Sequence, residues 1–343
     1  MSAGRGNALA ANSGMCQTIC VLDNVAIFFG QRHRRVVATV VMLLVPTAAA
    51  AQWRLASPPA AASWFHVLDS VGVAGTGAFR FTASGPERPT ELGRTLSRGG
   101  RYDILHFVPL YYPSAGTTAL ADALTQAAGN APPSAPRAQF LVGALRQALP
   151  TAAERAPLAD LAALMRRTTA RRVAAEALDA LQAHWNRALA PALAAFLHDQ
   201  QLDAGLLWVL PALGPEGRLF AGVAADRTDN IVAVAARPAD GNGPLYAAVR
   251  ELCFPLVSRT ADASPEFRRS AGSSAEAARR AGLAAVRCGA ELLDRVAPAE
   301  AGPYRTHWER VATRALTFDT AFPPDAVLAP PVRAALERYG ASH

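Results

Sequence analysis

A glutamate in the middle of an apolar helix is the side chain of this sequence best suited to acid–base chemistry. From Pro244 the chain reads L-Y-A-A-V-R-E-L-C-F-P-L-V, and its apolar residues recur every three or four positions. This spacing predicts an amphipathic helix with one continuous apolar face. Arg250, Glu251 and Phe254 project from the other side. Glu251 is therefore the candidate catalytic acid or base, and Pro255, directly after Phe254, favours a kink.

This helix and the elements predicted before it resemble the core of the zincin metallopeptidases. In that family the helix carries H-E-x-x-H: two histidines one turn apart bind zinc, and the glutamate activates the bound water. The aligned residues here are Arg-Glu-Leu-Cys-Phe, from Arg250 to Phe254. Glu251 takes the place of the general base, whereas arginine and phenylalanine replace both zinc ligands. The resemblance covers about residues 204–297 and rests more on the order of elements than on identical residues.

The resemblance also assigns a role to a later helix. Glu291, in A-E-L-L-D-R, stands where the glutamate-liganded zincins supply their third zinc ligand. If the helix of Arg250 is buried on both faces, the guanidinium needs a carboxylate partner, because an unpaired buried charge costs several kcal/mol. We predict that Glu291 or Asp294 is this partner, and that Arg250, Phe254, Glu291 and Asp294 form a pseudo-site. The ion pair would fill the space of a metal, so we predict no bound metal and no cofactor.

Cys253 and Cys288 are the cysteines that remain once the N-terminal leader described below is removed. In an exported protein such a pair is readily oxidised to a disulfide if the two Cα atoms come within about 7 Å. The alternative is two independent buried thiols, because Cys253 belongs to the apolar face of its helix. The spacing also does not exclude either cysteine as a nucleophile with His307 as its base.

Composition excludes several other kinds of active site. All 34 basic residues are arginine. A Walker A loop, a kinase ATP site and a pyridoxal-phosphate Schiff base each require lysine, so none of them is possible. No two histidines after the leader lie three to five positions apart, so the sequence contains no local pair of metal ligands. A G-x-S-x-G motif is also missing, which argues against a standard serine hydrolase.

The sequence predicts an α+β, mostly helical fold. Residues 52–200 are rich in alanine and leucine with helical periodicity, and form a mainly helical region. Residues 201–343 form the zincin-like region: a small antiparallel sheet at about 204–236, the helix of Glu251 and further helices. The predicted strands are 206–210, 218–223 and 231–235, and the predicted later helices are about 274–297, 303–317 and 330–339.

Residues 1–51 have the pattern of a signal peptide. Arg-His-Arg-Arg at 32–35 precedes an uncharged run at 36–46 and a small-residue tract that ends at Ala51. We predict cleavage between Ala51 and Gln52. The apolar run is too short to span a membrane, which needs roughly 20 residues. The mature protein is therefore expected in the periplasm or secreted, without a transmembrane anchor.

The charge of the mature chain gives no reason to expect nucleic-acid binding. The leader carries four arginines and one aspartate, so its removal lowers the net charge from +7 to +4. Together these features predict an exported, zincin-like pseudoenzyme without a working zinc site, which acts as a binding or scaffolding module. The alternative is an active, peptidase-like hydrolase that uses Glu251 in a non-standard site. The sequence indicates no particular ligand or partner.

Overall fold

The computed structural model describes most of the chain after the predicted leader. The described residues are 52–73, 89–97, 102–130, 132–133, 136–169, 172–213, 217–220, 230–235, 241–312 and 316–340. The leader, residues 1–51, and the last three residues of the predicted strand 218–223 lie outside them. Within the described ranges, every helix is too short or too polar to cross a membrane.

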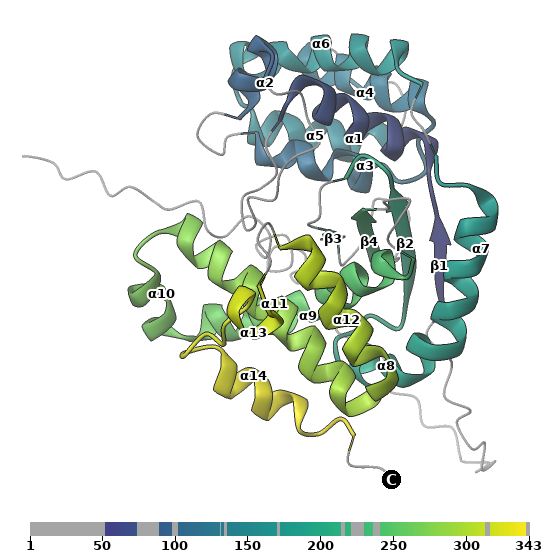
Figure 1. The fold of residues 1–343 in the computed structure, drawn as a ribbon. Helices are drawn as coiled ribbons and strands as arrows, with labels where there is room; N and C mark the ends of the chain where they lie inside the picture. The colour runs from purple at the N-terminus through teal and green to yellow at the C-terminus, as the bar shows by residue number, and fades with distance from the viewer. Residues whose placement is uncertain are drawn as a thin grey trace, which may run out of the picture.

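A four-stranded mixed sheet lies at the centre of the fold (Figure 1). Its strands are β1 (Gln52–Ala56), β2 (Ala204–Leu210), β3 (Arg218–Phe220) and β4 (Asn230–Ala235), in the order β1-β2-β4-β3. The strands β1, β2 and β4 are parallel, and β3 pairs antiparallel with β4 at the edge.

The structure confirms the predicted α+β, mostly helical fold but corrects the pairing of the strands. A small antiparallel sheet was predicted, whereas β2 and β4 are parallel neighbours and β3 lies on the far side of β4. The physical reason is burial, because residues 206–210 of β2 and 231–235 of β4 are continuous apolar runs that are covered on both faces, as is typical of parallel strands. Since β1 belongs to the predicted region 52–200 and β2 to the region 201–343, the two regions share one sheet.

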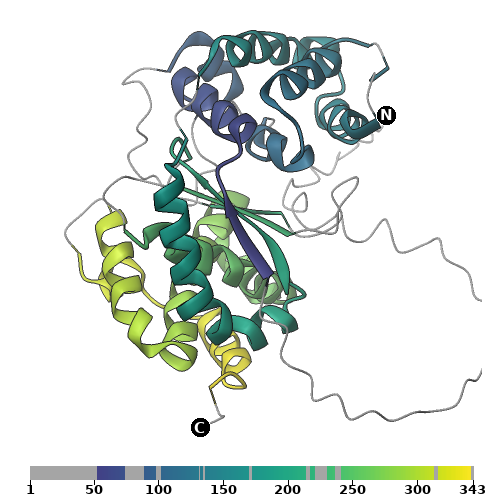
Figure 2. The ribbon, with the colours of Figure 1, turned by 90° about the vertical axis from the view of Figure 1, so that its right-hand side faces the viewer.

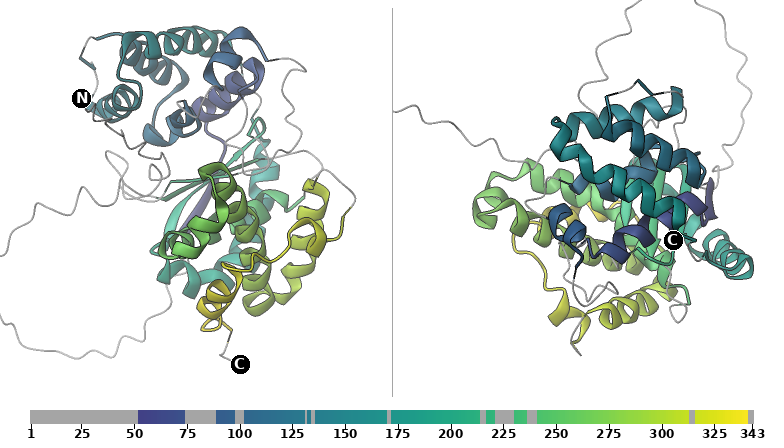
Figure 3. Two further views of the ribbon diagram at one scale, coloured as in Figure 1. Left: turned by 90° about the vertical axis from the view of Figure 1, so that its left-hand side faces the viewer. Right: turned by 90° about the horizontal axis from the view of Figure 1, so that it is seen from above.

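One layer of helices covers the first face of the sheet and forms the α1-side core. Trp208, Leu210, Ile231 and Ala233 point into it from β2 and β4. Figure 3 shows these helices gathered above the sheet. They are α1 (Pro59–Val71), α2 (Glu91–Leu96), the 3₁₀ helix η1 (Asp103–Phe107), α3 (Val108–Tyr111), α4 (Thr117–Ala128), α5 (Pro136–Ala148) and α6 (Ala152–Arg167).

A second layer covers the opposite face and forms the α9-side core. Leu207, Val209, Val232 and Val234 point into it, alternating with the residues that face α1, as the two-residue repeat of a strand requires. Its elements are α7 (Ala175–His184), the π-helix η2 (Trp185–Leu189), α8 (Ala190–Asp199), α9 (Gly243–Ala263), α10 (Pro265–Ala271), α11 (Ser274–Val296), α12 (Pro298–Val311), α13 (Phe318–Ala321) and α14 (Ala329–Leu336).

The predicted later helices correspond to α11, α12 and α14. Ser273 caps α11, since its hydroxyl oxygen accepts a hydrogen bond from the Glu276 backbone N–H at 3.2 Å. The short helices α10 and α13 were not predicted. With seven and four residues, they hold too few turns to show a helical repeat in the sequence.

The first strand of the sheet is held in place at its outer edge by α7, which runs beside it (Figure 2). The side-chain amide of Gln182 accepts a hydrogen bond from Leu55 N at 2.8 Å and donates one to Trp53 O at 3.1 Å. The indole of Trp53 is 2% exposed, and its Nε1 donates to Leu202 O at 3.0 Å. The chain is therefore anchored in the core from the second residue of β1.

Candidate functional site

The helix that carries Glu251 is α9, and it begins where the sequence predicts. Asn242 is its N-cap residue and Pro244 lies in its first turn, where a missing N–H costs nothing. Pro255 lies inside the helix. The predicted apolar face, from Leu245 to Val257, is buried. Arg250 and Glu251 on the other side are 4% and 3% exposed, so α9 is buried on both faces.

The guanidinium of Arg250 lies among the side chains of its own motif. Its Nη1 donates a short hydrogen bond to Glu251 Oε1, and the two groups form a buried ion pair. Its Cζ lies 5.4 Å from the centroid of the half-buried Phe254 ring, within the range of a cation–π contact. The positive charge of Arg250 thus lies between the side chains of Glu251 and Phe254.

A glycine at the start of β3 makes room for Glu251. A Cβ at Gly217 would lie 2.4 Å from Glu251 Cγ and 2.9 Å from the Ala233 carbonyl oxygen, so a larger residue would collide with both. The next residue, Arg218, is buried, and its Nη1 donates to Gly217 O at 2.7 Å. Glu251 is therefore packed between α9 and the two strands at the edge of the sheet.

Asp103 of η1 adds a second carboxyl group near Arg218. Burial raises the pKa of Asp103, and the nearby positive charge of Arg218 opposes this rise. Sequence reasoning did not identify Gly217, Arg218 or Asp103 as part of the site. The sequence offers only the turn-forming residues Gly-Pro-Glu-Gly that end at Gly217, and a turn alone does not indicate what packs against it.

The predicted partners of Arg250 lie elsewhere, so this prediction is wrong. Glu291 forms an ion pair with Arg333 of α14, with 3.4 Å between Oε1 and Nη2, and Asp294 forms a short ion pair with Arg305 of α12. Among the described residues, no ion pair joins Arg250 to either carboxylate. The condition behind the prediction is nevertheless met, because Arg250 is buried and paired with a carboxylate. The partner is its neighbour Glu251.

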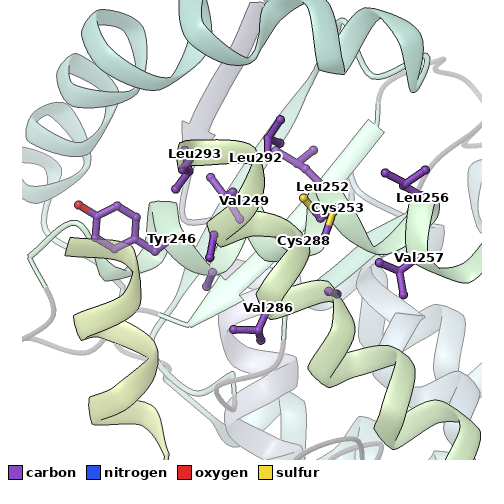
Figure 4. Close-up of a cluster of buried hydrophobic side chains, with 14 of the residues drawn as sticks. Tyr246, Val249, Leu252, Cys253, Leu256, Val257, Val286, Cys288, Leu292 and Leu293 are labelled. Carbon is purple, nitrogen blue, oxygen red and sulfur yellow. The ribbon is translucent and has the colours of Figure 1, made fainter. Parts of the chain in front are cut away.

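Cys253 and Cys288 lie side by side as free thiols in the buried contact between α9 and α11 (Figure 4). The predicted disulfide is not formed in this structure. The structure agrees with the alternative of two buried thiols, which here lie next to one another. Burial, together with the Cys253 thiol, raises the pKa of Cys288. A thiol kept protonated in an apolar core is a poor nucleophile, which argues against a cysteine-based active site.

A second polar cluster lies at the start of α9. Tyr246 donates a hydrogen bond to Glu300 Oε2 at 2.9 Å, and the same oxygen lies 3.2 Å from His184 Nε2. Asn242 Nδ2 is 3.2 Å from that histidine nitrogen. Burial raises the pKa of Tyr246 well above its usual value, and Glu300 raises it further. These contacts join α7, α9 and α12. Sequence reasoning missed them because the four residues are far apart in the chain.

The arrangement around Glu251 favours charge pairing over catalysis. A general base must reach the proton it removes, whereas the Glu251 carboxylate is buried and bonded to Arg250. In the part of the chain that the structure describes, no group of three or more His, Cys, Asp or Glu side chains converges as metal ligands would. Comparisons with protein-family models, curated proteins and solved structures found no match to this chain.

Proposed function

We propose that this chain is an exported, zincin-like protein without a working zinc site, and that it acts as a binding or scaffolding module. The observation that carries the proposal is the buried Arg250–Glu251 pair beside Phe254. The guanidinium supplies, from the protein itself, a positive charge next to the glutamate at the place where a zincin would bind its metal.

The order of elements supports the zincin-like interpretation. An antiparallel strand, β3, precedes β4, and β4 is followed along the chain by α9 with its central glutamate. Gly217 at the start of β3 packs directly against Glu251. The glutamate thus faces the edge of the sheet, and the resemblance drawn from the motif extends to its surroundings.

The chemistry of the motif favours a module over an enzyme. A catalytic zinc site keeps one coordination position open for water or substrate, and its glutamate must be free to accept a proton from that water. Neither arginine nor phenylalanine can bind zinc, and Glu251 is engaged by Arg250. A hydrolase that uses Glu251 would have to break this buried pair first, so the alternative has less support.

The metal content of the protein tests this proposal. We expect the unmodified protein to bind no stoichiometric zinc. Arg250→His combined with Phe254→His would place two imidazoles one turn apart on α9 beside Glu251, and we expect this variant to bind about one zinc per chain. Zinc titration followed by metal analysis of the folded protein measures both.

A matched control separates a metal site from a merely loosened helix. Arg250→Gln combined with Phe254→Gln changes the same positions without adding imidazole ligands, and should bind no zinc. The zincin-like assignment would be contradicted if the folded histidine variant took up no more zinc than the glutamine variant. Stoichiometric zinc in the unmodified protein would instead overturn the absence of a working site.

Export is the other part of the proposal. Cleavage after Ala51 would leave β1, Gln52–Ala56, in the mature chain. We expect protein recovered from the periplasm or the medium of an expressing bacterium to have the intact mass of a chain that begins at Gln52. Recovery of only the uncleaved chain, in the cytoplasm, would contradict export.

A further inference from the structure

The contact between α9 and α11 contains a feature that the proposed function does not use. Cys253 lies inside the motif, between Glu251 and Phe254, and Cys288 lies on α11. Their side chains are 0% and 1% exposed, and the two sulfur atoms point toward one another (Figure 4). The surrounding side chains, among them Leu252, Val257 and Leu292, are apolar.

The turn of α11 that carries Cys288 packs closely against Tyr304. Gly289, the next residue, leaves space for the Tyr304 side chain, because a Cβ there would lie 2.3 Å from the phenol oxygen. The Tyr304 hydroxyl donates a hydrogen bond to Val286 O at 2.9 Å. Tyr304 thus helps to hold the turn of α11 that carries Cys288 in place beside α9.

We propose that Cys253 and Cys288 are a redox-active pair that closes to a disulfide in an oxidising compartment and locks the motif helix α9 to α11. In the zincin resemblance a metal would connect the motif helix to a later helix, and the disulfide would provide a covalent connection between the same two elements. This proposal rests on the proposed export only for the oxidising compartment. The reaction between the two thiols does not require export.

The oxidation proceeds by thiol–disulfide exchange with a small disulfide or a protein disulfide oxidant. One cysteine thiolate attacks a sulfur of the oxidant, forms a mixed disulfide and releases one thiolate. The second cysteine, deprotonated, attacks the mixed disulfide and releases the other thiolate. The two electrons lost by the cysteines reduce the oxidant to two thiols, which take up the two protons. Because both thiols are buried in the folded protein, the exchange is fast only while α9 and α11 are still assembling.

Peptide mapping tests the proposal without reference to export. The full chain is refolded with a mixture of reduced and oxidised glutathione, alkylated and digested with trypsin. Since trypsin cleaves after arginine, it releases Cys253 in peptide 251–259 and Cys288 in peptide 288–295. We expect these two peptides joined by a disulfide, and separated by reduction. Recovery of both as alkylated monomers from the folded protein, or a link to Cys16 or Cys20, would overturn the proposal.

A stability measurement tests whether the disulfide stabilises the folded protein. Adding dithiothreitol should lower the urea midpoint of the refolded protein and leave the midpoint of a Cys253→Ala, Cys288→Ala double variant unchanged. The double variant controls for general effects of the reductant. An equal response of both proteins would overturn the role of the bond as a lock.

Discussion

Replacing Arg250 with methionine lowers the free energy of unfolding by about 3–5 kcal/mol, because the variant leaves the Glu251 carboxylate buried without its cation. Both side chains are at most 5% exposed, so water cannot replace the lost partner. Methionine has a similar length and no charge, and therefore keeps most of the packing. Urea unfolding followed by circular dichroism measures the difference.

Two matched variants separate the charge from the packing. Arg250→Met combined with Glu251→Gln removes both charges and should recover a large part of the loss, since a neutral pair in place of a buried ion pair is often tolerated. Arg279→Met breaks the exposed pair with Glu276 on α11, and should cost less than about 1 kcal/mol. The buried-pair interpretation fails if Arg250→Met is as mild as Arg279→Met.

Replacing Trp53 with alanine lowers the free energy of unfolding by about 3–5 kcal/mol, the usual cost of removing a buried tryptophan side chain. The variant leaves a cavity beside Trp185, whose ring centroid lies 6.3 Å away, and loses the hydrogen bond to Leu202 O. Because Trp53 is the second residue of β1, we also expect faster hydrogen exchange of the backbone amides in β1 and β2.

The neighbouring residue provides the control for Trp53. Arg54 lies on the same strand but is exposed, so Arg54→Ala should change stability by less than about 0.5 kcal/mol. Trp53→Phe should lie between the two, since it keeps part of the ring and loses the indole N–H. If all three variants unfold at the same urea concentration, β1 is not anchored through Trp53.

Hydrophobic periodicity was enough to predict the helical character of the fold and the start of its central helix. The apolar repeat from Leu245 to Val257 indicated α9 directly, because this signal is local, whereas the last turns of the helix, up to Ala263, lie beyond the repeat. The pairing of the strands was not local. Along the chain β3 comes between β2 and β4, but in the sheet it lies beyond β4, at the edge. No local feature of the sequence indicates this order. The strand β1 also escaped prediction, since its five residues directly follow the leader.

Of the predicted site residues, the structure brings Arg250, Glu251 and Phe254 together, whereas Glu291 and Asp294 form other ion pairs. Burial of α9 on both faces was correctly linked to a carboxylate partner for Arg250, but the partner was sought on α11. Adjacent residues on a helix do not normally face each other, so Glu251 was not considered. The long, flexible side chains of Arg250 and Glu251 nevertheless meet beside Gly217. The rotamers of these two side chains depend on the residues packed around them, and the sequence does not show that packing.

The side chain of Gln182 affects whether another copy of this protein can add a strand to the edge of β1. Its amide bonds Trp53 O and Leu55 N, the two groups that one residue of a parallel neighbouring strand would bond. An open strand edge is a template on which another chain can add a strand and begin aggregation. The Gln182 side chain makes the two hydrogen bonds that a further strand would make, and α7 covers the edge of β1. Among the described residues the sheet therefore ends at β1, and this outer strand is not left open to neighbouring chains.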